Sequence, residues 1–125
     1  MQVAELRHEE PVRLDMHRLK EIFAQMGFQN GENMICGAME DLAVLLKAAT
    51  KVWRRGDLDA LGQKARKISG LAEQIGMTTL SAVACDVAVI CARYDDAALG
   101  ATVARMTRLG ERSLIAIWES HDVSL

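Results

Sequence analysis

The chain contains little proline, few aromatic residues and almost no net charge. Pro11, near the N-terminus, is the only proline, and aromatic residues make up 4% of the 125 residues. Because proline disrupts the interior of a helix, its absence after residue 11 leaves long helices uninterrupted by proline. The formal net charge of −2 argues against the strongly basic surface of a nucleic-acid-binding protein, so we predict no nucleic-acid partner.

Long uninterrupted apolar runs are also missing. A helix that spans a membrane needs about 20 consecutive apolar residues, and no stretch of this sequence approaches that length. The first ten residues are charged and lack the apolar centre of a secretory signal peptide. We therefore expect a cytoplasmic protein that has no membrane partner.

Cysteine is scarce, and the pattern of a metal site is absent. Cys36, Cys85 and Cys91 lie on apolar helical patterns, and none has the close second cysteine of a zinc site. We expect all three to be small buried hydrophobic residues in a reducing compartment. The sequence also contains no P-loop, no Glu-x-x-His carboxylate arrangement and no Ser-His-Asp signature. We therefore predict no metal, no cofactor and no enzymatic activity.

Hydrophobic residues, by contrast, make up 50% of the chain and recur at steps of three and four. Leu, Ala, Met and charged residues dominate, and most of these are good helix formers. The spacing predicts five helices, at about residues 15–26, 32–54, 58–75, 78–94 and 97–119. Trp53 and Trp118 fall near helix ends, where we expect them at the edge of the core.

The connections between the predicted helices are short. Gly27 and Gly76 end the first and third helices, Gly56 suits a C-cap, and Asp15 and Asp57 suit N-caps. Short connections make neighbouring helices antiparallel, so we predict an all-α fold, an up-down four-helix bundle preceded by a short accessory helix. A single domain covers residues 1–125, with flexible ends at 1–14 and 120–125.

The third predicted helix carries the most informative pattern. Residues 65–72 have the sequence Ala-Arg-Lys-Ile-Ser-Gly-Leu-Ala, and Ile-Gly follows at 75–76. This segment resembles the phosphoacceptor helix of histidine-phosphotransfer (HPt) domains, whose motif is Ala-His-x-Leu-Lys-Gly-x-Ala with a further glycine ten residues after the histidine. The likeness covers about residues 14–118, including an Arg-Gly-Asp turn before the helix and a Tyr-Asp-Asp turn after the next one. It implies a place in two-component phosphorelay signalling.

Two positions depart from the family motif, and both concern its chemistry. Arg66 stands where the family has its reactive histidine, and an always-protonated guanidinium is a very poor nucleophile. Ser69 stands where the family has a lysine that supports the phosphoryl charge. The matching positions govern packing, so the resemblance implies a pseudo-HPt module that keeps the scaffold without accepting phosphate.

The resemblance also implies the partner, which would be the receiver domain of a response regulator or a histidine kinase. Receivers present an acidic pocket to HPt domains, and Arg66 would direct its donors at those carboxylates. Gly70, one turn further on, would let the partner approach, although close packing between helices is an alternative reason for a glycine there. A solvated cationic helix surface is the alternative to the docking role. The candidate partner-binding residues are Gly62, Arg66, Lys67, Ser69, Gly70 and Glu73.

Two other functions remain open. Residues 17–20, His-Arg-Leu-Lys, repeat the core of the motif, so the chain could be an active phosphotransfer protein that uses His17. Against this, Glu21 would add a negative charge beside the phosphoryl group, and Ile22 and Phe23 are bulky where the family has small residues. The third interpretation is a helical adaptor or dimerisation module with no link to phosphorelay.

Overall fold

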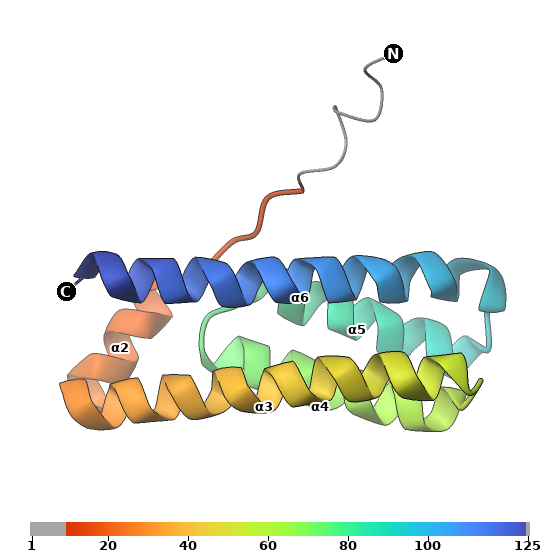
Figure 1. Cartoon of the computed structure of the whole chain (residues 1–125), viewed down its shortest axis with the longest axis horizontal. Coiled ribbons are helices and arrows are strands. Elements are labelled where there is room, and N and C mark those ends of the chain that lie inside the picture. The colour runs from red at the N-terminus through yellow and green to blue at the C-terminus, as the bar shows by residue number, and fades with distance from the viewer. Residues whose placement is uncertain (1–9, 125) are drawn as a thin grey trace, which may run out of the picture.

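The protein is all-helical, as the sequence predicts. A computed structural model describes residues 10–124, and within them it contains no β-strand, only an isolated bridge between Leu14 and Met77. The five helices (Figure 1) are α2 (Met16–Met26), α3 (Phe28–Arg54), α4 (Leu58–Gln74), α5 (Thr78–Arg93) and α6 (Asp96–Ser124). Nowhere in residues 10–124 is a helix both long and apolar enough to cross a membrane.

Each of the long helices reverses the direction of the one before it. Helix α3 packs against α4, α4 against α5, α5 against α6, and α6 returns to α3. Figure 1 shows α3 and α6 lying lengthwise beside each other, while α2 crosses at the end where α3 begins and α6 ends. Helix α2 packs on α3. This arrangement follows from the short turns, which leave each helix beside its neighbour in sequence.

The junction between α2 and α3 is tighter than the sequence predicts. Gly27, with φ of +81°, ends α2 and also begins α3, so α3 starts at Phe28 rather than near residue 32. Gly31 permits this sharp corner, because a Cβ atom there would lie 2.9 Å from Cδ1 of Phe23 on α2. Contact between the two helices therefore makes residues 28–31 helical although their local sequence, Phe-Gln-Asn-Gly, is a weak helix signal.

The end of α4 is fixed by Gly76, as predicted. Its φ is +78°, and a Cβ atom on it would lie 2.8 Å from the backbone oxygen of Asp15. The backbone N–H of Asp15 in turn donates to the carbonyl of Gly76 at 2.7 Å. Both the backbone conformation and the close approach demand glycine. The start of α2 is thereby tied to the end of α4.

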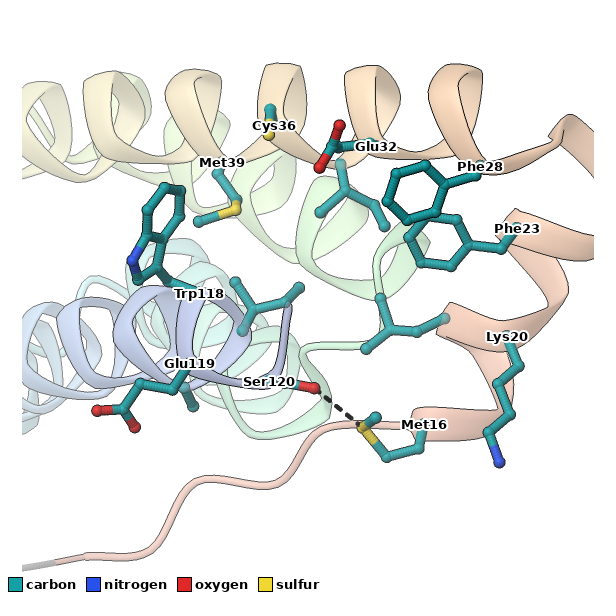
Figure 2. Close-up of a pocket in the computed structure, with 14 residues that line it drawn as sticks. Met16, Lys20, Phe23, Phe28, Glu32, Cys36, Met39, Trp118, Glu119 and Ser120 are labelled. Atoms are coloured by element: carbon teal, nitrogen blue, oxygen red, sulfur yellow. Dashed lines mark hydrogen bonds between the residues drawn. The ribbon is translucent and has the colours of Figure 1, made fainter. Parts of the chain in front are cut away.

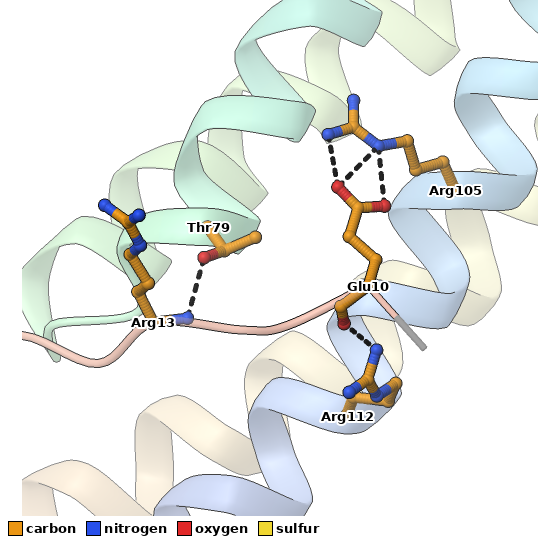
Figure 3. A network of polar contacts seen from close by, with 5 residues as sticks. All are labelled: Glu10, Arg13, Thr79, Arg105 and Arg112. Carbon is orange, nitrogen blue, oxygen red and sulfur yellow. Dashed lines mark hydrogen bonds and ion pairs between the residues drawn. The ribbon is translucent and has the colours of Figure 1, made fainter. Parts of the chain in front are cut away.

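Residues 10–14, expected to be a flexible end, are instead held along the helices (Figure 3). The Glu10 carboxylate accepts from Arg105 on α6, with Nη2–Oε2 at 2.6 Å, and its carbonyl accepts from Arg112. The backbone N–H of Arg13 donates to Oγ1 of Thr79 on α5 at 2.8 Å. The pKa of Glu10 is lowered, chiefly because its carboxylate is hydrogen-bonded to Arg105. Residues 1–9 lie outside the described part of the chain.

Two other expectations need correction. Helix α6 continues through Ser124 instead of ending near residue 119. Of the three cysteines, only Cys91 is buried, whereas Cys36 and Cys85 are exposed. Each of the exposed pair directly follows a buried apolar residue, so it lies one helical step, about 100°, away from the buried stripe.

Candidate functional site

The six candidate residues of α4 do not lie on one face. Arg66, Lys67, Gly70 and Glu73 are exposed, but Gly62 is buried and Ser69 is half-buried. The exposed group forms a ridge along the solvent side of the helix. The other two residues face α5 and hold the structure together. We call Arg66, Lys67, Gly70 and Glu73 the α4 ridge.

Arg66 lies in the middle of the 17-residue helix α4. Its Nη1 atom is 3.6 Å from where a Cβ atom on Gly62 would lie, so the side chain lies back toward the helix N-terminus. Arg66 is also close enough to Cys91 on α5 to affect its titration. Burial raises the pKa of the Cys91 thiol, and the positive charge of Arg66 opposes that rise. The guanidinium therefore lies at the exposed edge of the α4–α5 interface.

Gly62 is a packing residue, which corrects its place among the partner-binding candidates. A Cβ atom on it would lie 3.5 Å from Cβ of Cys91 on α5. The sequence pattern misplaces this glycine because a residue without a side chain adds nothing to an apolar stripe. Its small size lets α5 come close and leaves room for Arg66 above it.

Ser69 is likewise engaged within the fold. Its hydroxyl donates to the carbonyl of Ser81 on α5 at 3.0 Å, and the Ser81 hydroxyl donates to the carbonyl of Ser69 at 3.1 Å. This reciprocal pair ties α4 to α5 across the Gly76 turn. Ser69 and Ser81 lie at similar distances before and after the turn at Gly76, so they meet when α4 and α5 pack as antiparallel neighbours.

Gly70 has open space around it. Nothing lies within 4 Å of a Cβ atom placed there, so the alternative that Gly70 allows close helix packing is wrong. Gly70 instead borders a hollow of ≈ 560 Å³ between α3 and α4. The lining residues are Asp41, Val44 and Leu45 of α3 and Lys67, Gly70, Leu71 and Gln74 of α4. The α4 ridge thus has the α5 edge on one side, near Arg66, and this hollow on the other.

His17, the alternative phosphoacceptor, lies on the short helix α2. Its side chain is 84% exposed, and its Nε2 atom is 3.7 Å from Oε2 of Glu21. The carboxylate that was expected beside a phosphoryl group at this position is therefore present. In residues 10–124, no group of three or more His, Cys, Asp or Glu side chains is placed to hold a metal ion.

A second hollow, larger than the one beside Gly70, was not predicted from the sequence. It is an apolar groove of ≈ 700 Å³ where α2, the first half of α3 and the last turns of α6 meet (Figure 2). Phe23, Phe28 and Trp118 contribute aromatic rings to it, and Met16 and Met39 contribute thioethers. A groove whose residues come from segments far apart in the sequence leaves no contiguous motif in that sequence. The only sequence signal was the number of large apolar residues near positions 16–39 and 114–118.

Comparisons of the chain with protein-family models, with curated proteins and with solved structures find no match. The resemblance of α4 to the HPt motif therefore stays a prediction from the sequence. The chemical capacity of the α4 ridge follows from its own geometry. It offers an exposed guanidinium and an ammonium group beside an uncrowded glycine, which suits non-covalent binding of carboxylates.

Proposed function

We propose that this chain is an HPt-like protein of a two-component phosphorelay system, a pseudo-phosphotransfer module in the cytoplasm. It would bind the receiver domain of a response regulator, or a histidine kinase, through the α4 ridge without exchanging phosphate. The observation that carries the proposal is the exposure of Arg66 in the middle of α4, one turn from the uncrowded Gly70. The family places its phosphoacceptor histidine at the matching position.

The helix arrangement is compatible with the proposed scaffold. We interpret α3 to α6 as an up-down four-helix bundle and α2 as the short accessory helix. The cyclic packing of α3, α4, α5 and α6, with α2 on α3, supports that interpretation.

The charge around the α4 ridge supports an acidic partner. Arg66 and Lys67 are exposed on α4. Further exposed cations line the preceding helix and its end, namely Lys47, Lys51, Arg54 and Arg55. Such charges speed the encounter with an acidic surface, and salt screens this attraction, so binding should weaken at high salt.

A titration of the purified chain against receiver domains and histidine kinases from the same cell tests the docking role. We expect one of them to bind, and Arg66→Glu to weaken that binding by about tenfold or more, because repulsion replaces a charge-assisted contact. Arg108→Glu is the matched control, since it reverses an exposed cation on α6, and α6 packs mainly on α3 and α5 rather than on α4. Binding that is unchanged in Arg66→Glu, or equally weakened in the control, would contradict the role of Arg66.

A phosphotransfer assay separates this proposal from its alternative. The chain is incubated with an autophosphorylating kinase or a phosphorylated receiver, and acid-labile label is measured. We expect none on wild type. Label that appears on wild type and is lost in His17→Ala would replace the proposal with an active phosphotransfer protein. Absence of both label and binding would leave a helical adaptor outside phosphorelay.

A further inference from the structure

The apolar groove between α2, α3 and α6 lies on surfaces that the proposed function does not use. Its volume of ≈ 700 Å³ falls within the range of about 300–1,000 Å³ that is common for binding sites. Figure 2 shows Phe23 and Phe28 on one side of it and Trp118 on the other. The rings of the two phenylalanines are stacked, with centroids 5.5 Å apart. They form a firm aromatic wall.

The groove exists because α3 and α6 pack closely at one end of their interface and lie apart at the other end. A Cβ atom on Gly110 of α6 would lie 2.6 Å from Cδ1 of Leu46, and one on Gly100 would lie 3.4 Å from the Trp53 ring. These two glycines therefore let α6 approach α3 closely over the first half of α6. After Gly110, α6 contains no glycine, and α2 crosses at that end (Figure 1). The two long helices are left with an unfilled channel between them.

Large apolar side chains remain in contact with solvent around this channel. Met16 is 45% exposed, Phe28 53% and Trp118 55%. Isolated exposed apolar residues are ordinary on protein surfaces, but a group that surrounds a concave site marks a site of interaction. Methionine side chains such as Met16 and Met39 adapt to different apolar partners, as in grooves that bind helices.

The charged residues at the rim indicate which charge a bound partner would carry. Among the described residues of the lining, Glu32 of α3 and Glu119 of α6 are acidic and Lys20 of α2 is basic. Figure 2 places the two carboxylates on opposite sides of the apolar floor. Aromatic faces also attract cations. A second copy of the chain would bring the same acid-rich rim, so it complements this one poorly.

We propose that this groove binds an amphipathic helix from a partner protein, with large apolar side chains on one face and lysine or arginine flanking them. The apolar face would lie against Ile35 and Trp118, and a flanking cation would meet Glu119. A helix laid into an apolar groove is a recurrent mode of recognition. This surface is separate from the α4 ridge, so the protein would join two partners.

The test uses two labelled synthetic peptides of about 15 residues, a length at which an amphipathic helix can form. Both have leucines at helical spacing, and one is flanked by lysines while the other is flanked by glutamates. Fluorescence anisotropy measures their binding to the full chain. We expect the lysine-flanked peptide to bind saturably. The glutamate-flanked peptide should bind at least about tenfold more weakly. Trp118→Ala should weaken the first by about tenfold.

Charge reversal supplies the matched control. Glu119→Lys should weaken binding of the lysine-flanked peptide and strengthen that of the glutamate-flanked one. Glu111→Lys changes the net charge equally at an exposed position of α6 outside the groove, so it should do neither. Arg66→Glu should leave peptide binding unchanged, which keeps this inference separate from the α4 ridge. Equal effects of the two glutamate reversals, or no saturable binding, would overturn the proposal. So would sedimentation as a dimer with Trp118 shielded, which would assign the groove to a second copy.

Discussion

The α4 ridge and the apolar groove differ in almost every physical property. The ridge is a convex strip of one helix, cationic around Arg66, and its four residues come from eight consecutive positions, 66–73. The groove is concave and apolar, and it combines residues as far apart in sequence as Met16 and Ser120. The comparison teaches that a site on one helix can be recognised from its sequence motif, whereas a groove between helices can be recognised only from the folded structure.

The largest expected effect comes from Gly76, which joins the two regions. Gly76→Ala forces a side chain into a left-handed conformation and against the Asp15 carbonyl, so we expect a loss of stability of about 3 kcal/mol. Since Asp15 caps α2, which lines the groove, and Gly76 ends α4, both binding activities should fall together. Urea unfolding followed by circular dichroism measures the loss. A variant as stable as wild type would contradict the described contact.

Ser69→Ala distinguishes residues that hold the ridge from residues that bind. Removing the hydroxyl breaks one hydrogen bond to α5 within a reciprocal pair, so we expect a loss of about 1 kcal/mol. Arg66→Ala should change stability by less than about 0.5 kcal/mol, because Arg66 is exposed. Chemical denaturation of both variants gives the comparison. Equal losses would mean that Arg66 also has a structural role.

Gly70→Ala should raise the stability of the protein, unlike Gly76→Ala and Ser69→Ala. Alanine favours a helix over glycine by about 1 kcal/mol, and the site has room for a Cβ atom. Gly37→Ala on α3 is the matched control, since nothing lies within 4 Å of a Cβ atom there either. Both should raise the melting temperature. A bulkier change, Gly70→Leu, should weaken receiver or kinase binding while Gly37→Leu does not, if Gly70 gives clearance to a partner.

The smallest effect concerns the segment around Glu10, which lies apart from both regions. Its folded pKa is below the ordinary value of 4.5, so its contribution to stability is full above that pH and is lost as pH falls through the folded pKa. Glu10→Gln should therefore melt slightly earlier than wild type near neutral pH, and the difference should vanish at low pH. Melting curves across the acidic range measure this. A difference that grows on acidification would contradict the ion pair with Arg105.

Features that depend on local rules could be predicted from the sequence. Asp15 and Asp57 cap their helices as expected, each accepting a backbone N–H at 3.1 Å. Gly27, Gly56 and Gly76 all adopt positive φ at helix ends. These features depend on a few neighbouring residues, so pattern and propensity are sufficient to predict them. The start of α3 was missed because the corner between Phe23 and Gly31 depends on contact between two helices.

By itself, the sequence determined an all-helical chain, the ends of most helices and the exposed position of Arg66, because backbone preferences and apolar periodicity act within one helix. Only the tertiary structure decided which glycine of α4 is buried. Gly62 meets α5 and Gly70 meets open space, although the two residues are identical and lie on the same helix. The groove also belongs to the tertiary structure. It depends on where α6 can approach α3 and where α2 crosses, and these distances are set by packing between segments far apart in sequence.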